Sequence, residues 1–110
     1  MLTATATHTA ALARFGHALS DPTRVGILLA LRSAPGHPAD LADALGVSRQ
    51  VMSNQLACLR GCGLVEATPE GRRMSYALSD PHLEAALDEL LQVVLRVEPD
   101  CCAGPDCRCA

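Results

Sequence analysis

Two cysteines, Cys58 and Cys62, stand four residues apart in the stretch QLACLRGCGLV. If this stretch is helical, both thiols lie on one face of the helix, with Cβ atoms about 5–6 Å apart. A disulfide requires Cβ atoms about 3.5–4.5 Å apart, so the pair fits poorly as a disulfide within an intact helix. The spacing instead favours two thiolates that bind one soft metal ion together.

A site of this kind needs at least one further ligand, and the end of the chain supplies candidates. The stretch EPDCCAGPDCRCA contains four cysteines, namely Cys101, Cys102, Cys107 and Cys109. Three or four thiolates select thiophilic ions over Mg²⁺, Ca²⁺ or Mn²⁺. We therefore predict a metal site made by the helical pair together with Cys102 or Cys101, and we treat the last two cysteines as additional candidate ligands.

Simpler explanations exist for both groups of cysteines. Free cysteine often behaves as a small buried apolar residue, which would give Cys58 a role in packing alone. The cysteines of the tail could equally be exposed thiols that bind metals adventitiously. The position of Cys62 one helical turn after Cys58, with four more cysteines downstream, makes the metal site the favoured interpretation.

The elements that must position the cysteine pair follow from hydrophobic periodicity and from turn residues. Residues 1–8 are small and polar, and we expect them to be loose. Helices are predicted over residues 11–19, 22–34, 38–45, 49–62 and 82–97, and strands over 64–68 and 72–78. The two strands are joined by Pro69-Glu70-Gly71, which is typical of a hairpin turn.

Capping residues mark where these helices begin and end. Asp21 precedes Pro22, and Asp80 precedes Pro81, which are both typical helix starts. Gly46 is suited to a left-handed helix end, and Ser48 caps the helix that follows. Two short helices joined by such a glycine turn are typical of a helix-turn-helix.

The helix over 49–62 has a core face and an outward face. Met52, Leu56 and Leu59 are predicted to face the core. The outward and flanking positions are Arg49, Gln50, Ser53 and Asn54. Gln and Asn can contact adenine, and Arg can contact guanine, in the major groove of double-stranded DNA. The outward face therefore predicts direct base contacts, although an ordinary solvated polar face is the simpler alternative.

The hairpin after this helix carries two neighbouring basic residues, Arg72 and Arg73. On a wing they would meet phosphate groups, which position a protein on DNA without specifying sequence. The order of elements thus predicts a mainly α fold with a small β-hairpin, a winged helix-turn-helix with an extra helix at each end. We assign residues 1–97 to one DNA-binding and dimerisation domain and residues 98–110 to a cysteine-rich tail.

The last predicted helix is more apolar than one face of a small domain requires. Its apolar positions are Leu83, Leu87, Leu90, Leu91, Val94 and Val97. We expect these residues to supply part of the core and part of a homodimer interface.

Charge and composition restrict the classes of function. The net charge is −3, but residues 1–79 hold seven Arg and five acids, whereas residues 80–110 hold two Arg and seven acids. Basic groups on one face still allow DNA binding. One Phe, one Tyr and no Trp argue against a binder of single-stranded nucleic acid, which would stack bases on aromatic rings.

The sequence shows neither a signal peptide nor a run long and apolar enough to span a membrane. We expect a cytoplasmic protein without a membrane partner, where cysteines are ligands or sensors more often than structural disulfides. No nucleophile and base are paired in the sequence, and thiolates would close the metal site, so we do not expect an enzyme.

Three stretches, SDPTRVGILLAL, DLADALGVSRQVMSNQLACLRGCGLV and EGRRMSYAL, resemble the ArsR/SmtB family of metal-responsive repressors. The resemblance covers about residues 11–97 and implies a homodimer that binds operator DNA when metal-free and is released by metal. CLRGCGLV resembles the cadmium- and lead-sensing branch, where the helical cysteines bind metal with a third cysteine from the C-terminal region. This implies Cd(II) or Pb(II) as effector, with Zn(II) or As(III) as further candidates.

The sequence departs from the family at two other metal sites. GHPADLA lacks the thiol motif that other members carry near the first helix of the helix-turn-helix. The zinc site on the family's long helix would begin with Asp80 and His82, but its remaining positions are Val93 and Arg96, which do not bind metal. We therefore interpret His82 as a surface residue at a helix start.

Three alternatives remain open. Cys101 and Cys102 with Cys107 also resemble a C-terminal arsenite site found in some members, which would make the protein an arsenite-responsive repressor. A thiol redox-sensing repressor would use oxidation of the tail cysteines without a metal. A metal-buffering protein would keep the DNA-binding fold without the function.

Overall fold

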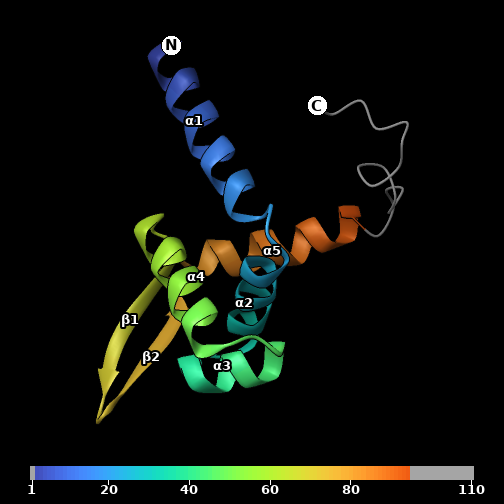
Figure 1. The fold of residues 1–110 in the computed structure, drawn as a ribbon. Helices are drawn as coiled ribbons and strands as arrows, with labels where there is room; N and C mark the ends of the chain where they lie inside the picture. Colours follow the sequence, from blue (N-terminus) through green and yellow to red (C-terminus); the bar gives the residue numbers. More distant parts are fainter. Residues whose placement is uncertain (1, 95–110) are drawn as a thin grey trace.

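The computed structural model describes residues 2–94, and the side chains of residues 7–93. The elements follow in the order α1 (Leu2–Ala18), α2 (Pro22–Ser33), α3 (Pro38–Leu45), α4 (Arg49–Gly61), β1 (Val65–Glu70), β2 (Arg73–Leu78) and α5 (Pro81–Val94). Figure 1 shows α2, α3 and α4 gathered into one body, with the hairpin on one side of it and α5 across it. The predicted mainly α winged helix-turn-helix, with an added helix at each end, is therefore confirmed.

The core lies among the helices of the body and the base of the hairpin. Its largest fully buried side chains are Ile27, Leu28, Met52, Leu56 and Leu59. Three of these come from the predicted core face of α4, which is confirmed. Their burial fixes the rotation of α4 about its axis, and this decides which residues it presents to solvent and to its neighbours.

Local capping explains the ends of α2, α3 and α4. The Asp21 carboxylate accepts a hydrogen bond from the Arg24 backbone N–H at 3.1 Å, and the Ser48 hydroxyl accepts one from the Val51 N–H at 3.0 Å. Gly46 ends α3 with a φ of 67°, a conformation that side chains with a Cβ rarely adopt. Both caps and the glycine turn were predicted from the sequence.

The β-hairpin begins its turn later than predicted. β1 extends through Pro69, which pairs with Met74, to Glu70, which pairs with Arg73. The turn therefore consists of Gly71, with a φ of 63°, and Arg72. Proline is tolerated in β1 because a two-stranded sheet has free edges, where a missing N–H costs no ladder hydrogen bond.

A short bridge attaches the hairpin to the body. The Gly36 N–H donates to the Tyr76 carbonyl at 2.9 Å, and the Tyr76 N–H donates to the Gly36 carbonyl at 2.8 Å. Gly36 is suited to this position because a Cβ there would lie 3.3 Å from the Leu41 side chain. The bridge restricts how far the wing can swing away from α2 and α3.

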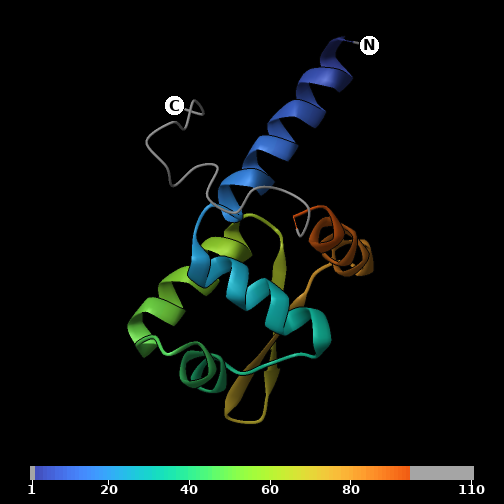
Figure 2. The ribbon, with the colours of Figure 1, turned by 90° about the vertical axis from the view of Figure 1, so that its right-hand side faces the viewer.

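The N-terminal helix is longer than predicted. Instead of residues 1–8 being loose, α1 begins at Leu2. The stretch before Gly16 contains several alanines and neither glycine nor proline, so nothing in it ends a helix. Figures 1 and 2 show α1 projecting away from the body, to which it is joined at its C-terminal end. Ala18 is fully buried there, whereas Leu12 remains 70% exposed.

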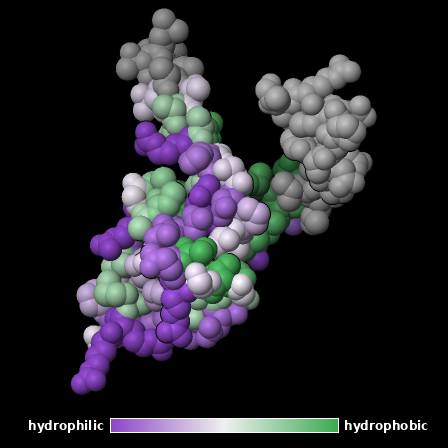
Figure 3. Space-filling view, in the orientation of Figure 1, coloured by the Kyte–Doolittle hydropathy of each residue, from purple (hydrophilic) through white to green (hydrophobic). Residues whose placement is uncertain are grey.

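α5 divides its apolar residues between the body and solvent. Leu87 is 4% exposed and belongs to the core of the chain itself. Leu90 and Val93 are 36% and 57% exposed, and Figure 3 shows strongly hydrophobic residues gathered over the visible part of this helix. No helix in the stretch 2–94 has both the length and the apolarity needed to cross a bilayer.

Candidate metal centre and DNA-reading helix

The two helical cysteines lie at the C-terminal end of α4. Cys58 is in its last turn, and Cys62 is the C-cap, with φ −82° and ψ −5°. The Cys62 N–H donates to the Cys58 carbonyl at 3.1 Å, so the helical register continues to the cap. Both are free thiols and both are half-buried. The predicted spacing of one helical turn is therefore present in the fold.

A glycine directly after the pair holds Cys62 in place. Gly63 has a φ of 79° and donates its N–H to the Arg60 carbonyl at 3.0 Å, while the Leu64 N–H donates to the Leu59 carbonyl at 3.0 Å. These two hydrogen bonds are the Schellman arrangement, which requires a left-handed residue at this position. The glycine in CLRGCGLV thus fixes the backbone that carries the second thiol.

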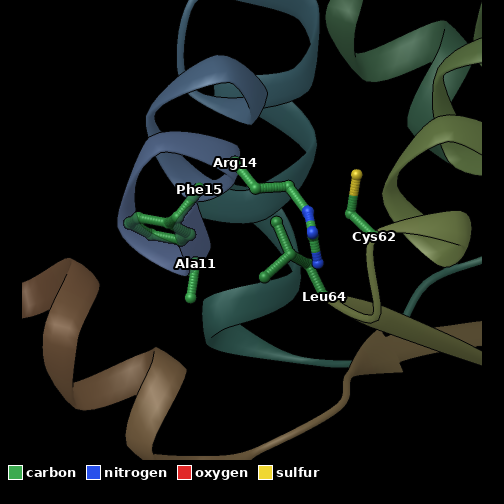
Figure 4. Close-up of a pocket in the computed structure, with 5 residues that line it drawn as sticks. All are labelled: Ala11, Arg14, Phe15, Cys62 and Leu64. Carbon is green, nitrogen blue, oxygen red and sulfur yellow. The ribbon is translucent and has the colours of Figure 1, made fainter. Parts of the chain in front are cut away.

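Cys62 faces the N-terminal helix. It lines a cavity of about 200 Å³ together with Ala11, Arg14, Phe15 and Leu64. Figure 4 shows the Arg14 side chain extending from α1 toward the segment that carries Cys62 and Leu64. A thiolate or a thiolate-bound metal at Cys62 would therefore lie in a groove between α1 and α4 with a guanidinium nearby.

Within the part of the chain that the structure describes, no three His, Cys, Asp or Glu side chains lie together in a way that could hold a metal ion. The two thiols are a fitting but incomplete donor set, because soft ions bind three or four thiolates. The predicted tail ligands Cys101, Cys102, Cys107 and Cys109 lie outside the described residues, as does the predicted boundary of the tail at residue 97.

His82 occupies the surface position expected of it. Its side chain is 95% exposed, and its Nδ1 lies 2.9 Å from the Asp80 carboxylate. The backbone N–H of His82 also donates to that carboxylate at 2.7 Å. The backbone and side-chain hydrogen bonds from His82 lower the pKa of Asp80 below its ordinary value. This pair begins α5 as a helix cap.

The predicted base-reading residues share the exposed side of α4. Arg49, Gln50, Ser53 and Asn54 are all exposed. The Gln50 side-chain amide donates to the Asn54 side-chain oxygen at 3.0 Å. This contact restricts the rotamers of both amides before any ligand arrives. Assigning DNA contacts to these residues remains a prediction.

The two arginines of the wing differ in their surroundings. Arg72 occupies the turn, at the strongly hydrophilic end of the hairpin seen in Figure 3. Arg73 donates to the Asp40 carboxylate of α3 at 2.9 Å. His37 lies next to this pair, with its Nε2 3.3 Å from the Glu70 carboxylate. The sequence reasoning did not anticipate that Arg73 joins the wing to α3.

A second long-range contact was also missed. Arg24 of α2 donates from its Nη1 to the Gln55 side-chain oxygen of α4 at 3.1 Å. No local signal marks this pair, because the two residues are 31 positions apart. Gln55 stands three residues before Cys58 and is half-buried.

Comparison with known proteins identifies the family of the chain. Residues 21–67 match the family model described as "Bacterial regulatory protein, arsR family". The HTH-type transcriptional regulator CmtR of Mycobacterium tuberculosis is 59% identical over 90 residues, which are 82% of this chain and 76% of CmtR. The chain belongs to the arsR family of bacterial regulatory proteins. The resemblance seen in the sequence is thereby confirmed.

Solved structures agree with this assignment. An NMR structure described as the cadmium metal-sensor CMTR from Mycobacterium tuberculosis is 58% identical to this arsR-family chain, with a TM-score of 0.67, and the match covers 81% of this chain and 92% of that one. The homodimeric winged helix-turn-helix domain of Mb0332 from Mycobacterium bovis is 32% identical, with a TM-score of 0.74 and 83% of each chain covered. CmtR is a transcriptional regulator, and Mb0332 is described as a possible ArsR-family transcriptional regulator. Membership of this family of regulatory proteins agrees with the prediction that the chain is not an enzyme.

Proposed function

We propose that this arsR-family chain is a homodimeric repressor that binds operator DNA when metal-free and releases it when Cd(II) or Pb(II) binds through thiolates. The observation that supports the proposal best is the position of Cys58 and Cys62 on α4. They are half-buried at one end of the helix that carries the exposed amides Gln50 and Asn54. A metal that binds the thiols acts on the helix that would read DNA.

The choice of Cd(II) or Pb(II) is based on the chemistry of the thiolate ligands and on the similarity of the chain to CmtR. Thiolates favour soft ions, and the CmtR structure is described as a cadmium sensor. We propose Cys102, or Cys101, as the third ligand, contributed by either subunit of the dimer. Zn(II) can also bind to thiolates, and As(III) would use Cys101, Cys102 and Cys107. Cys107 and Cys109 remain additional candidates.

Exposed apolar residues on two helices support the homodimer. Leu12 of α1 and Leu90 and Val93 of α5 are large apolar side chains that the described part of the chain leaves exposed. α1 also projects from the body (Figure 2), and its residues 7–14 are exposed in this chain. The Mb0332 domain with the same fold is homodimeric. We propose that α1 and α5 form the interface.

A dimer would place two α4 helices on successive major grooves, about 34 Å apart. A metal that changes the orientation of each helix would spoil this register. Allosteric coupling of this kind is commonly about 1–3 kcal/mol, which corresponds to a 5- to 150-fold change in operator affinity. The proposed target of the protein is double-stranded operator DNA in a promoter of the bacterial cell. We therefore propose that the protein acts in the cytoplasm.

The decisive experiment is fluorescence anisotropy with DNA from the chain's own promoter, titrated separately with Cd(II), Pb(II), Zn(II) and arsenite. We expect tight binding without metal and release by Cd(II) or Pb(II), together with thiolate-to-metal absorbance. Cys102→Ser should lower release, whereas Cys107→Ser and Cys109→Ser should have smaller effects. Release by arsenite that depends only on Cys101, Cys102 and Cys107 would support the arsenite repressor instead. Release by an oxidant without metal would support a redox sensor, and no DNA binding at all would support a metal buffer.

The dimer has its own test. Leu90→Asp places a charge in the proposed interface and should give a monomer in sedimentation experiments, because an unpaired buried charge is costly. Met74→Asp is the matched control, since Met74 on the wing is exposed to the same 36% as Leu90. A Leu90→Asp protein that remains dimeric would remove this part of α5 from the interface.

A further inference from the structure

The guanidinium of Arg24 connects the end of α1 to the reading helix α4. Its Nε donates to the Ala18 carbonyl at 3.0 Å, and its Nη2 donates to the His17 carbonyl at 2.9 Å. Its Nη1 donates to the Gln55 side chain at 3.1 Å. One planar group therefore holds two carbonyls of α1 and one amide of α4 at the same time.

Arg24 is itself fixed in position. Its backbone N–H is bound by the Asp21 carboxylate that caps α2, and its side chain is half-buried. The carbonyls at a helix C-terminus carry partial negative charge, so a cation there is favourable. Arginine alone among the basic residues offers several donors in a rigid plane, so lysine could not make all three contacts.

The contact at Gln55 lies on the flank of α4 that carries the thiols. Gln55, Cys58 and Cys62 are spaced by three and four residues, so they follow one another along one side of the helix. The same side faces α1, because Cys62 shares its cavity with Ala11, Arg14 and Phe15. Cys62 lies at the cavity beside α1 (Figure 4), and the contact between Arg24 and Gln55 lies about two helical turns earlier along α4.

We infer that Arg24 and Gln55 are positioning residues that couple the thiol pair to DNA binding, an inference that rests on the proposed function. The hydrogen bond between them holds α4 against the end of α1 in the arrangement that presents Gln50 and Asn54. A metal bound by Cys58 and Cys62 would act on the same flank of α4 and would favour a shift of this helix relative to α1. The hydrogen bonds of Arg24 oppose that shift. The difference between these two free energies would then determine how strongly metal lowers operator affinity.

The test compares operator affinity with and without Cd(II) in Gln55→Met and Arg24→Met proteins. Gln55→Met removes only the acceptor on α4 and leaves the contacts of Arg24 with α1 in place, so we expect it to fold. Its metal-free operator affinity should fall, and the factor by which Cd(II) lowers affinity should drop from about 5- to 150-fold to about threefold or less. Cd(II) binding, followed by thiolate-to-metal absorbance, should persist.

A double-mutant cycle and a control separate coupling from general destabilisation. If the two residues act through their mutual bond, Arg24→Met with Gln55→Met should lose no more coupling than the more affected single variant. Arg24→Lys should retain only part of the coupling that Arg24→Met loses. Arg32→Met is the matched control, because Arg32 is also on α2 and half-buried, but its 2.8 Å contact is with Asp88 of α5. It should keep the wild-type metal response.

Three results would overturn the inference in distinguishable ways. If Cd(II) releases the Gln55→Met protein by the same factor as the wild-type protein, the inference is wrong and the proposed function stands. If Cd(II) does not release the wild-type protein from its promoter, the proposed function is wrong and the inference fails with it. If Arg32→Met loses the metal response as fully as Gln55→Met, the loss reflects general loosening of α2, and the assignment to the Arg24–Gln55 bond is wrong.

Discussion

The outward face and the α1-facing flank of α4 have different surroundings although they belong to one helix. The outward face carries Gln50 and Asn54, which are exposed and contact each other. The flank carries Gln55, Cys58 and Cys62, which are half-buried, and Cys62 lines a cavity with residues of α1. The outward face is accessible to a ligand as large as DNA. The flank is accessible to a small ion and would respond to a shift of α1.

This separation implies that DNA binding and metal response can be changed independently. Burial of Met52, Leu56 and Leu59 fixes the rotation of the helix between the two sides. A change on the outward face should alter affinity with and without metal by the same factor. A change on the flank should alter the ratio of the two affinities, whether or not the metal-free affinity also changes.

The thiols test the flank most directly. Cys58→Ser and Cys62→Ser should each bind the operator as the wild-type protein does without metal, because neither side chain is on the outward face. Each should resist release by Cd(II) or Pb(II), so that a coupling factor of about 5- to 150-fold falls close to one. Anisotropy titrations measure both quantities. A Cys58→Ser protein released at the wild-type cadmium concentration would contradict the assignment of the flank.

The amides test the outward face. Gln50→Ala or Asn54→Ala should cost about 1–3 kcal/mol of operator affinity and relax sequence preference, while the response to cadmium is kept. Because the two amides are hydrogen-bonded at 3.0 Å, the double variant should cost less than the sum of the single ones. Competition binding with altered operators measures this, and an unchanged sequence preference would show that the reading residues lie elsewhere.

Substitutions of the two wing arginines test whether an exposed arginine contacts DNA regardless of its other partners. Arg72→Ala should lower the salt dependence of binding by about one phosphate contact, a slope change of about 0.9. Arg73→Ala should lower it less, because its guanidinium already binds Asp40. Asp40→Ala should free Arg73 and raise affinity. Binding measured over a series of salt concentrations decides this, and equal slopes for the two arginine variants would mean that the ion pair opens on DNA.

The helix cap formed by Asp80 and His82 at the start of α5 gives the smallest expected effect. His82 lowers the pKa of Asp80 mainly through its backbone hydrogen bond and also through its side chain. The ionised carboxylate therefore stabilises the fold at neutral pH, and this contribution is lost as the pH falls below about 4. Asp80→Asn should lower Tm slightly at pH 7 and by less at pH 3, with unchanged operator and cadmium binding. An equal change in Tm at both pH values would contradict the role of the charge.

Much of the fold could be predicted because it is set by neighbours in the sequence. Asp21, Gly46 and Ser48 act within three or four residues, and the spacing of Met52, Leu56 and Leu59 follows the helical repeat. The start of α1 and the hairpin turn were mispredicted. Polar threonines between alanines looked like a loose end, and Pro69 looked like a turn residue, although the free edge of a two-stranded sheet accepts it.

The sequence by itself determined that two thiols share one side of a helix, because four residues make about one helical turn. Only the tertiary structure decided what that side faces. The partners of Gln55 and Arg73 lie 31 and 33 positions away along the chain, and Leu87 is buried whereas Leu90 is exposed. Such contacts depend on how whole helices pack against one another, and no local pattern of residues carries that information.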